Sequence, residues 1–300
     1  MDVSVIIVNY NTGDLIRRCI ESVLEQERVD FELIIVDNAS HDQSVQILEE
    51  YANVIPAKAG IQPKIKLIKS PENLGFGRAN NLAAQHASGK FLYLLNPDAY
   101  LSEKEALKRL VDFLEQHPQF GVVGTRIVSS RGEAETYPKT RHTGEKIFKD
   151  SFKSLKGSIA WVIGASMAIP KHLFDEIKGF DPDFFLYGED EDLCLRVRKL
   201  GYEIGYCPEV TVEHYDAGSE QKTTSYELAC KKQKALILFY EKHFSPADVV
   251  TLLTRELRLT SMRLFFHQLR SFLHLSPSPE SQSRYRAIRD INREFLAHKK

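Results

Sequence analysis

The sequence predicts an α/β fold in which a mostly parallel sheet is flanked by helices and followed by a C-terminal helical extension. In the first half of the chain, short apolar runs alternate with segments whose apolar residues recur at helical spacing. This β-α-β-α order is typical of a parallel sheet with helices on its faces. Polar residues directly follow several of the apolar runs, at the strand ends where such sheets bind ligands.

The predicted elements begin with the continuously apolar run Val3–Val8, as expected of a strand buried on both faces. Thr12 is predicted to cap the next helix, whose apolar stripe ends at Leu24. Ser102 and Glu105 form a predicted capping box before a later helix. Further strands are expected at Phe31–Val36, Ile65–Ile68, Phe91–Leu95, Gly121–Ile127 and Val210–Val212, and further helices from about Asp42, at Gly75–Ala87 and at Glu189–Leu200.

Charge divides the chain into two predicted domains. Residues 226–300 contain 14 basic and 7 acidic residues and carry a charge of +7, whereas residues 1–225 carry −8. We therefore expect an acidic α/β domain over 1–225 and a basic helical extension over 226–300. A helix is predicted from Ser245 to about Leu273, and Ser276–Pro279 is predicted to be a linker before a last helix, Ser281–His298.

Two stretches are predicted to lack regular structure. Ala52–Pro63 contains two prolines and a glycine and is expected to be a surface loop. Ser129–Ser158 is polar and glycine-containing, which predicts a mobile excursion near the site, with disorder without function as an equal alternative.

Composition bears on the location of the chain. No stretch approaches the roughly 18 apolar residues of a membrane span, and we expect no secretory leader because the first strand begins at Val3. The four cysteines form no Cys-x-x-Cys pair, so buried free thiols are favoured over zinc or disulfides. These observations predict a cytoplasmic protein, and we expect no nucleic-acid partner.

Tyr10 and Asp37 follow neighbouring predicted strands. An aromatic ring can stack on a nucleotide base, and a carboxylate can accept a hydrogen bond from a pyrimidine N3–H. Core packing of Tyr10 and helix capping by Asp37 are the structural alternatives, but their shared position at strand ends favours binding. Arg78 could reach a phosphate, and a solvated helix charge explains it equally well.

Two acidic clusters indicate catalysis. Asn96-Pro97-Asp98 follows a predicted strand, and carboxylates there can hold a divalent cation that in turn binds a diphosphate. Glu189-Asp190-Glu191-Asp192 opens a predicted helix, where a carboxylate can take a proton from an attacking hydroxyl. Turn chemistry explains the first cluster and the helix dipole the second, although four successive carboxylates exceed what a helix start needs. His214 also follows a predicted strand and is a candidate metal ligand, although a lone histidine is usually structural.

Taken together, these segments resemble a family 2 glycosyltransferase with the GT-A fold, of the bacterial rhamnosyltransferase-like branch. The resemblance covers about residues 3–219, and its motifs stand in the family's order. The matching segments are Val5-Ile6-Ile7-Val8-Asn9-Tyr10-Asn11, Val36-Asp37-Asn38-Ala39-Ser40, Asn73-Leu74-Gly75-Phe76-Gly77, Leu94-Leu95-Asn96-Pro97-Asp98, Gly164-Ala165, Gly179-Phe180-Asp181, Phe184–Leu193 and His214.

For substrate binding, the resemblance implies that Tyr10, Asn11 and Asp37 lie where the family holds the nucleotide base and ribose. Gly164 and Ala165 match a segment near the donor sugar and the acceptor. The stretch Ala52–Pro63 is an insertion relative to typical members.

For catalysis, the resemblance implies that Asp190 is the general base. Asp98 matches the metal-binding aspartate of the family's Asp-x-Asp motif, and Asn96 replaces the first aspartate, a departure that bears on metal affinity. His214 matches a position that can complete the metal and diphosphate site. The implied reaction is an inverting single displacement that uses Mg²⁺ or Mn²⁺.

The resemblance implies a nucleotide-sugar donor and a glycan or lipid-linked glycan acceptor at the cell surface. A dTDP-activated deoxyhexose such as rhamnose is the donor expected first. A UDP-hexose-dependent hexosyltransferase is the alternative enzyme, and a non-catalytic sugar-nucleotide-binding paralogue is the alternative outside enzymes.

The extension mixes arginines with bulky apolar residues between Arg255 and Leu273. This composition permits peripheral contact with the anionic inner face of a membrane. The apolar residues spread around the predicted helix, so packing against the α/β domain or in a homodimer through the C-terminal helices stays open.

Overall fold

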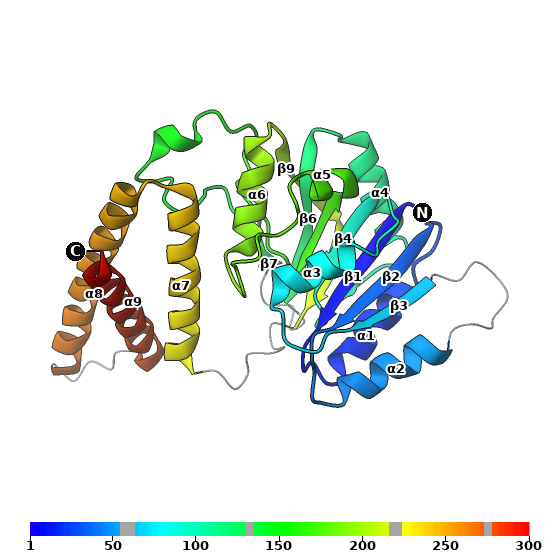
Figure 1. The fold of residues 1–300 in the computed structure, drawn as a ribbon, viewed down its shortest axis with the longest axis horizontal. Coiled ribbons are helices and arrows are strands. Elements are labelled where there is room, and N and C mark those ends of the chain that lie inside the picture. Colours follow the sequence, from blue (N-terminus) through cyan, green and yellow to red (C-terminus); the bar gives the residue numbers. More distant parts are fainter. Residues whose placement is uncertain (55–63, 130–134, 216–223, 273–277, 300) are drawn as a thin grey trace. The chain divides into compact units, whose positions relative to one another are not determined.

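The computed structural model describes residues 1–54, 64–129, 135–215, 224–272 and 278–299 of the 300-residue chain (Figure 1). The chain forms two compact units. The first contains Met1–Thr143, Asp150–Phe185 and Glu189–Gln221, and the second contains Gly144–Lys149, Leu186–Gly188 and Lys222–Lys300.

The first unit is built on a mixed sheet with the strand order β3-β2-β1-β4-β8-β6-β9-β5, and β7 pairs with β6. Strands β3, β2, β1 and β4 are parallel to one another, β8 is antiparallel to both β4 and β6, and β9 is parallel to β6 and antiparallel to β5. The strands are β1 (Val3–Asn9), β2 (Phe31–Asp37), β3 (Lys64–Lys69), β4 (Phe91–Leu95), β5 (Ala99–Leu101), β6 (Phe120–Ser129), β7 (Glu135–Thr136), β8 (Ser166–Pro170) and β9 (Glu203–His214).

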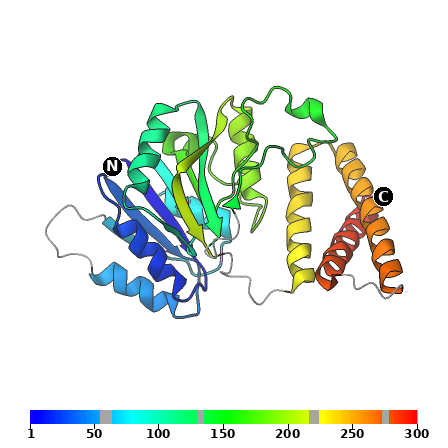
Figure 2. The same cartoon turned by 180° about the vertical axis from the view of Figure 1, so that it is seen from behind.

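Helices cover both faces of this sheet (Figures 1 and 2). Side chains of α1, α2 and α4 pack on one face, and side chains of α3, α5 and α6 pack on the other. The inner strands are therefore apolar at nearly every position, as the run Val3–Val8 indicates. The helices are α1 (Leu15–Leu24), α2 (Ser44–Val54), α3 (Phe76–Ala84), α4 (Ala106–Gln116), α5 (Lys171–Glu176) and α6 (Glu189–Lys199), with a short 3₁₀ helix at Lys149–Phe152.

The strand registers bring polar residues together at the carboxyl edge of the sheet. Asn9 lies opposite Asp37 in the β1–β2 ladder. The β1–β4 ladder pairs Ile7 with Leu95, the last residue of β4. The short strand β5 pairs Ala99 with His214, so the chain after β4 and the end of β9 meet. Neither β5 nor β8 was predicted from the sequence.

Two predicted helix caps are wrong. Helix α1 begins at Leu15, and the Thr12 hydroxyl donates to the side-chain oxygen of Asn9 instead of capping it. Helix α4 begins at Ala106 without a side-chain cap of its own. The amide of Leu107 donates to Gln26 Oε1 at 2.9 Å, so a side chain from another segment serves as the acceptor.

The two stretches predicted to be irregular are partly structured. Helix α2 continues to Val54, so the start of the predicted loop Ala52–Pro63 is helical, and residues 55–63 lie outside the described residues. Within Ser129–Ser158, β7 pairs with the edge of β6, and Thr143 bonds to Glu191. Edge pairing and side-chain bonds thus order a polar segment that has no hydrophobic period; residues 130–134 lie outside the described residues.

The second unit contains three helices, α7 (Ser225–His243), α8 (Pro246–Phe272) and α9 (Pro279–His298). Helix α7 was not predicted, although Thr224 and Glu227 form a reciprocal capping box at its start. The predicted linker at Ser276–Pro279 is wrong in its last two residues: Ser278 caps α9 and accepts a hydrogen bond from the Ser281 amide at 3.3 Å, and Pro279 is the first residue of that helix.

Three buried or half-buried polar side chains join these helices. Gln233 of α7 donates to Glu256 of α8 and to Asn292 of α9, both at 2.7 Å. Asn292 in turn donates to Glu256 at 2.9 Å. This triad fixes how the three helices align, because sliding any helix would leave buried polar atoms unpaired.

The four cysteines are free thiols; Cys19, Cys194 and Cys207 are buried, as predicted, and Cys230 is half-buried. Among the helices of the described residues, none combines the length and the apolar character needed to cross a bilayer.

Candidate active site

The loops after β1 and β2 are held together by buried Asn9. Its side-chain amide donates to Asp37 Oδ1 at 3.3 Å, to Ser40 Oγ at 3.0 Å and to Ser44 Oγ at 2.9 Å. Asp37 is 5% exposed, so most of this carboxylate is withdrawn from solvent. The sequence prediction assigned no role to Asn9, although it ends a strand directly before Tyr10.

Tyr10 and Asn11 lie on the loop that this network supports, at the same edge as Asp37. Asn11 has a left-handed backbone with φ of 52°, a conformation that asparagine tolerates better than most residues. Its amide donates to Ser40 Oγ at 3.1 Å, and its Oδ1 accepts from the His41 amide at 2.7 Å. Tyr10 is half-buried and therefore presents part of its side chain to solvent.

Asn38 ties the start of α3 to the end of β2. Its Oδ1 accepts from the Leu74 amide at 2.8 Å, and its Nδ2 donates to Asn73 Oδ1 at 2.9 Å. Gly75 has φ of 78°, and a Cβ there would lie 2.1 Å from the carbonyl oxygen of Phe185. This close approach admits only glycine. Asn38 and Asn73 were not predicted as site residues, and their positions beside Asp37 and Gly75 were the available signal.

Arg78 lies in the first turn of α3 and is half-buried. Its Nε donates to the Leu74 carbonyl at 2.7 Å, and its guanidinium lies 6.0 Å from the ring centroid of Phe185. The Leu74 contact fixes the base of the side chain, so any phosphate contact falls to the two terminal nitrogens.

Asp98 and His214 meet where β5 pairs with β9. His214 Nε2 lies 3.1 Å from Asp98 Oδ1 and 3.4 Å from Asn96 Nδ2. Asp98 is 7% exposed, and its carbonyl accepts from the Tyr215 amide at 3.0 Å. The structure thus brings together the three residues that the sequence assigned to the metal and diphosphate region.

The donor atoms of this group fit a divalent cation that shares its shell with a phosphate ligand. Within the described residues, no cluster of three or more His, Cys, Asp or Glu side chains could hold a metal ion by itself. Mg²⁺ is commonly held by one or two carboxylates together with substrate phosphates and water. Asp98, His214 and the amide oxygen of Asn96 are consistent with such a partial shell.

Gly164 and Ala165 connect this group to the acidic helix start. The Gly164 amide donates to Asp190 Oδ2 at 3.3 Å, and the Ala165 carbonyl accepts from the Asn96 amide at 2.9 Å. A Cβ on Gly164 would lie 2.9 Å from the ring of Phe76, so α3 also abuts this segment. One dipeptide therefore spans the distance between the two acidic clusters.

The four carboxylates at the start of α6 have four different environments. Glu191 accepts from the Thr143 amide at 2.6 Å and from its hydroxyl at 2.7 Å. Asp192 pairs with Arg196 at 2.8 Å, one turn along the helix. The argument that all four exceed structural needs is therefore wrong for these two, which hold the local fold.

The other two carboxylates, Glu189 and Asp190, are adjacent and differently solvated. Asp190 is half-buried and accepts from the Glu191 and Gly164 amides. Burial raises the pKa of Asp190 to about 6, although these two backbone hydrogen bonds lower it. Glu189 is 5% exposed, and its Oε2 has no hydrogen-bond partner among the described residues. Burial first, and then the charge of Asp190, raise the pKa of Glu189 to about 8.

This mixed sheet, with acidic side chains gathered at its carboxyl edge, has the architecture of the GT-A glycosyltransferases. The chain belongs to glycosyl transferase family 2: the model of that family matches residues 4–178, and the model of glycosyl transferase family group 2 matches residues 92–276. The family predicted from the sequence is confirmed.

Several curated relatives are named as rhamnosyltransferases. Rhamnosyltransferase WbbL of Escherichia coli (strain K12) is 26% identical over 241 residues, which cover 71% of this chain and 83% of WbbL. The N-acetylglucosaminyl-diphospho-decaprenol L-rhamnosyltransferase of Mycobacterium tuberculosis (strain H37Rv) is 22% identical over 273 residues, or 80% of this chain and 84% of that protein. Other relatives are longer: the match spans 25% of y4gI of Sinorhizobium fredii and 18% of RfbC of Myxococcus xanthus.

Solved structures share the fold at low sequence identity. Staphylococcus aureus TarS 1–349 in complex with UDP matches with a TM-score of 0.58 and 18% identity, over 99% of this chain and 92% of that one. The mannosyltransferase PcManGT from Pyrobaculum calidifontis, in complex with GDP-Man and Mn²⁺, matches with a TM-score of 0.59 and 18% identity, over 99% and 85% of the two chains. The predicted GT-A fold is confirmed.

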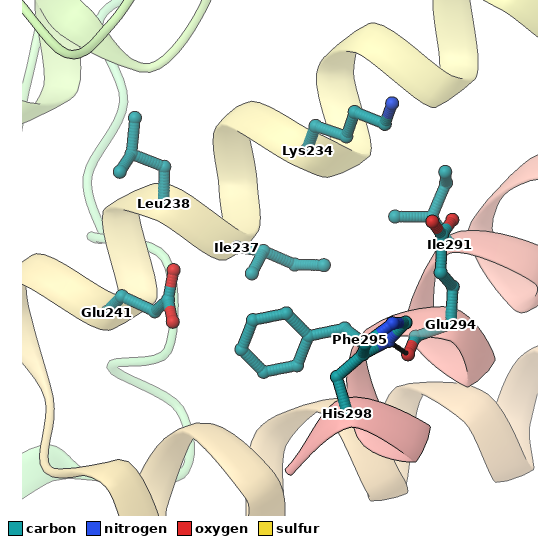
Figure 3. Close-up of a pocket in the computed structure, with 8 residues that line it drawn as sticks. All are labelled: Lys234, Ile237, Leu238, Glu241, Ile291, Glu294, Phe295 and His298. Atoms are coloured by element: carbon teal, nitrogen blue, oxygen red, sulfur yellow. Dashed lines mark hydrogen bonds between the residues drawn. The ribbon is translucent and has the colours of Figure 1, made fainter.

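A cavity of about 280 Å³ lies in the second unit, between α7 and α9 (Figure 3). It is lined by apolar and charged side chains from both helices, and none of the predicted site residues contributes to it. The lining residues are Lys234, Ile237, Leu238, Glu241, Ile291, Glu294, Phe295 and His298.

The pair Glu189 and Asp190 predicts a dependence of stability on pH. Both pKa values in the folded protein exceed the ordinary ones, so the folded state binds more protons than the unfolded state between about pH 4 and pH 8. The contribution of these groups to the free energy of unfolding is therefore full below about pH 4 and lost as the pH rises through this window. Glu189→Gln should lose less stability than the wild type between about pH 5 and pH 9, measured by urea unfolding.

The matched control is Glu176→Gln, which changes an exposed glutamate of α5. It should lose as much stability as the wild type over the same range. An identical loss in Glu189→Gln and the wild type would contradict a protonated Glu189 in the folded protein.

Proposed function

We propose that the protein transfers a deoxyhexose such as rhamnose, with inversion, from a nucleotide diphosphate donor to a hydroxyl of a growing cell-surface glycan. The observation that carries this proposal is the hydrogen-bonded path from Asp190 through Gly164 and Ala165 to Asn96, beside Asp98 and His214. A single displacement needs a base for the attacking hydroxyl and a group that binds the leaving diphosphate. The two kinds of group lie close together here, joined by this short path. Two relatives named as rhamnosyltransferases support the choice of sugar, because the match to this chain covers most of the length of each.

In this proposal Asp190 is the general base. Its carboxylate takes the proton of the acceptor hydroxyl while that oxygen attacks the anomeric carbon on the face opposite the leaving diphosphate. The Gly164 and Glu191 amides hold the two carboxylate oxygens, so the base is oriented before the acceptor arrives. A pKa raised to about 6 by burial makes this carboxylate a stronger base than an exposed aspartate, while it is still ionised at neutral pH.

The diphosphate would lie beside Asp98, Asn96 and His214. A bound Mg²⁺ or Mn²⁺ would neutralise charge on the leaving nucleotide diphosphate. Asn96 offers a neutral amide oxygen where the family's Asp-x-Asp motif has a carboxylate, so this chain contributes one negative charge fewer to the cation. Arg78 can add positive charge from α3 through its terminal guanidinium nitrogens.

The nucleotide would occupy the edge formed by the loops after β1 and β2. Tyr10 offers a half-exposed ring for stacking, and Asn11 and Asp37 offer acceptors for the base or ribose. Asn9 and Ser40 hold both loops, so this edge is arranged before ligand arrives.

A UDP-hexose donor is the second candidate. Poly(ribitol-phosphate) β-N-acetylglucosaminyltransferase TarS of S. aureus is 32% identical over 120 residues, which cover 39% of this chain and 19% of TarS. TarS 1–349 has been solved with UDP. A donor with a uracil base and an N-acetylhexosamine is therefore the alternative to test beside a deoxyhexose.

For location, we propose a cytoplasmic protein that acts at the inner face of the membrane. The M. tuberculosis relative is named for an acceptor on a decaprenol carrier. A lipid-linked glycan of that kind is the acceptor class proposed here.

The donor proposal predicts the outcome of a thermal-shift panel. The panel is run with and without Mn²⁺. A dTDP-deoxyhexose at about 100 times its dissociation constant should raise the free energy of unfolding by roughly 2.7 kcal/mol. UDP-, GDP- and dTDP-sugars are compared at equal concentration, with the free nucleotides as controls. Stabilisation by a UDP-hexose alone would favour the second candidate.

The base assignment predicts that Asp190→Asn lowers turnover by roughly 10²–10⁴-fold, because the amide cannot accept the acceptor's proton. Donor binding should persist, since the amide has the size of the carboxylate. Asp175→Asn, at an exposed position of α5, is the control and should leave turnover unchanged. Turnover of Asp190→Asn within a fewfold of the wild type would refute the assignment.

The metal assignment predicts that Asp98→Ala weakens Mn²⁺-dependent binding of a nucleoside diphosphate by about tenfold or more. Asn96→Asp should leave this binding intact or tighten it, because it restores a second negative ligand. Calorimetry with Mn²⁺ or EDTA measures both effects. Equal affinities of wild type and Asp98→Ala in saturating Mn²⁺ would exclude Asp98 as a ligand.

A further inference from the structure

Helix α8 exposes a row of large apolar side chains. Leu259, Met262, Phe265, Phe266 and Leu269 have relative exposures of 42%, 51%, 61%, 52% and 42%. Their spacing of three and four residues places them on one side of the helix, which we call the outer face of α8. The opposite side packs inward through Leu253, Thr260 and Leu264.

The outer face of α8 is also basic. Arg255, Arg258 and Arg270 are exposed along the same helix. Between Val249 and Arg270 the sequence contains one acidic residue, Glu256, and this side chain is bonded to Gln233 and Asn292 in the helix interface. The other acidic residue of α8, Asp248 in its first turn, accepts a hydrogen bond from the Ser245 hydroxyl at 2.7 Å. The face thus combines exposed aromatic and aliphatic groups with positive charge that no carboxylate of this segment offsets.

We propose that the outer face of α8 docks on a lipid surface that carries anionic headgroups. A helix of 27 residues with aromatic and aliphatic side chains on one face can lie in the plane of the headgroups and bury that face. Arginines on the same helix attract anionic lipids and reach the headgroups while their stems stay in the apolar layer. A row of large apolar side chains exposed to water otherwise has no stabilising contact.

Charge distinguishes this partner from a second copy of the chain. In a two-fold symmetric contact the same face lies on both sides, so arginines of one copy would face arginines of the other. No acidic side chain of the segment is available to pair with them, and like charges brought together oppose association. An anionic lipid surface has no such cost.

The inference depends on the proposed function only in that a lipid-linked acceptor gives the docking a purpose. Docking would hold the enzyme in the layer where such an acceptor is found. Vesicle binding is measured without donor or acceptor, and the donor panel without lipid, so either can fail while the other stands.

The test is co-sedimentation of the full chain with vesicles of phosphatidylcholine containing about 30% phosphatidylglycerol. The wild type should bind at low salt and be released at about 0.5 M salt, where screening shortens to a few ångströms. It should bind vesicles of phosphatidylcholine alone much more weakly. Arg255→Gln with Arg258→Gln should lower partitioning by roughly 30-fold, from the loss of two charges near the surface.

Phe265→Ser with Phe266→Ser removes apolar groups from the face and keeps its charge, and should lower partitioning by at least about tenfold. The matched controls change an exposed arginine and an exposed aromatic residue of the first unit: Arg141→Gln and Tyr137→Ser should bind like the wild type. Each variant should keep the wild-type melting temperature and the wild-type turnover with a water-soluble acceptor.

Three results would overturn the proposal. One is a wild type that stays in the supernatant with anionic vesicles at low salt. Another is vesicle binding by both double variants that equals that of the wild type. The third is a wild-type dimer in sedimentation analysis that the phenylalanine variant converts to monomer, which would assign the face to a second copy.

Discussion

The arrangement of the first unit depends on helices covering both faces of its sheet. With both faces buried, the middle of each inner strand carries apolar side chains, and polar groups are displaced to the strand ends. The parallel registers of β1, β2 and β4 then bring those ends to one edge. Antiparallel β8 begins directly after Gly164 and Ala165 at that edge, where Ser166 pairs with Leu95. Polar side chains are concentrated at this edge because the apolar packing on both faces of the sheet excludes them from the middle of the strands.

The same constraint separates residues of one chemical type into different roles. Glu189, Asp190, Glu191 and Asp192 are consecutive, and a helical turn directs each to a different neighbour. Glu191 contacts a threonine and Asp192 an arginine, whereas no basic side chain of the described residues pairs with Glu189 or Asp190. The raised pKa values of Glu189 and Asp190 therefore come mainly from the buried surroundings into which the helix directs them, rather than from the number of carboxylates present.

The apolar strands were predictable from sequence because burial on both faces leaves a continuous apolar run, as in Val3–Val8 and Phe91–Leu95. Strands β5 and β8 were not, because three residues at a sheet edge and five that follow an irregular loop carry no distinctive period. The predicted caps at Thr12 and Ser102 failed because contacts with other residues replace them. The Thr12 hydroxyl donates to Asn9, and Gln26 accepts from an amide in the first turn of α4.

For the candidate site, the sequence located residues that follow strands, and the structure gathers them at one edge. What it could not supply were the connecting contacts. Asn9 and Asn38 act through side-chain amide hydrogen bonds that leave no pattern in the chain. Gly164 and Ala165 were placed near the donor sugar by resemblance, but their backbone hydrogen bonds to Asp190 and Asn96 appear only in the structure. Glu189 was hidden among its acidic neighbours, since its burial comes from tertiary packing: it lies beside Gly77 of α3, where an added Cβ would lie 3.9 Å from Glu189 Cβ.

The triad of Gln233, Glu256 and Asn292 bears on how this protein can be shortened, by evolution or by design. Each of the three helices supplies one member, and the last member lies near the end of the chain. A deletion that removed α9 would strip Gln233 and Glu256 of a shared partner in an otherwise packed interface, and the two remaining helices would lose the contact that aligns them. The three helices therefore depend on one another, and a chain shortened before α9 would carry the first unit followed by two helices that lack their shared buried partner.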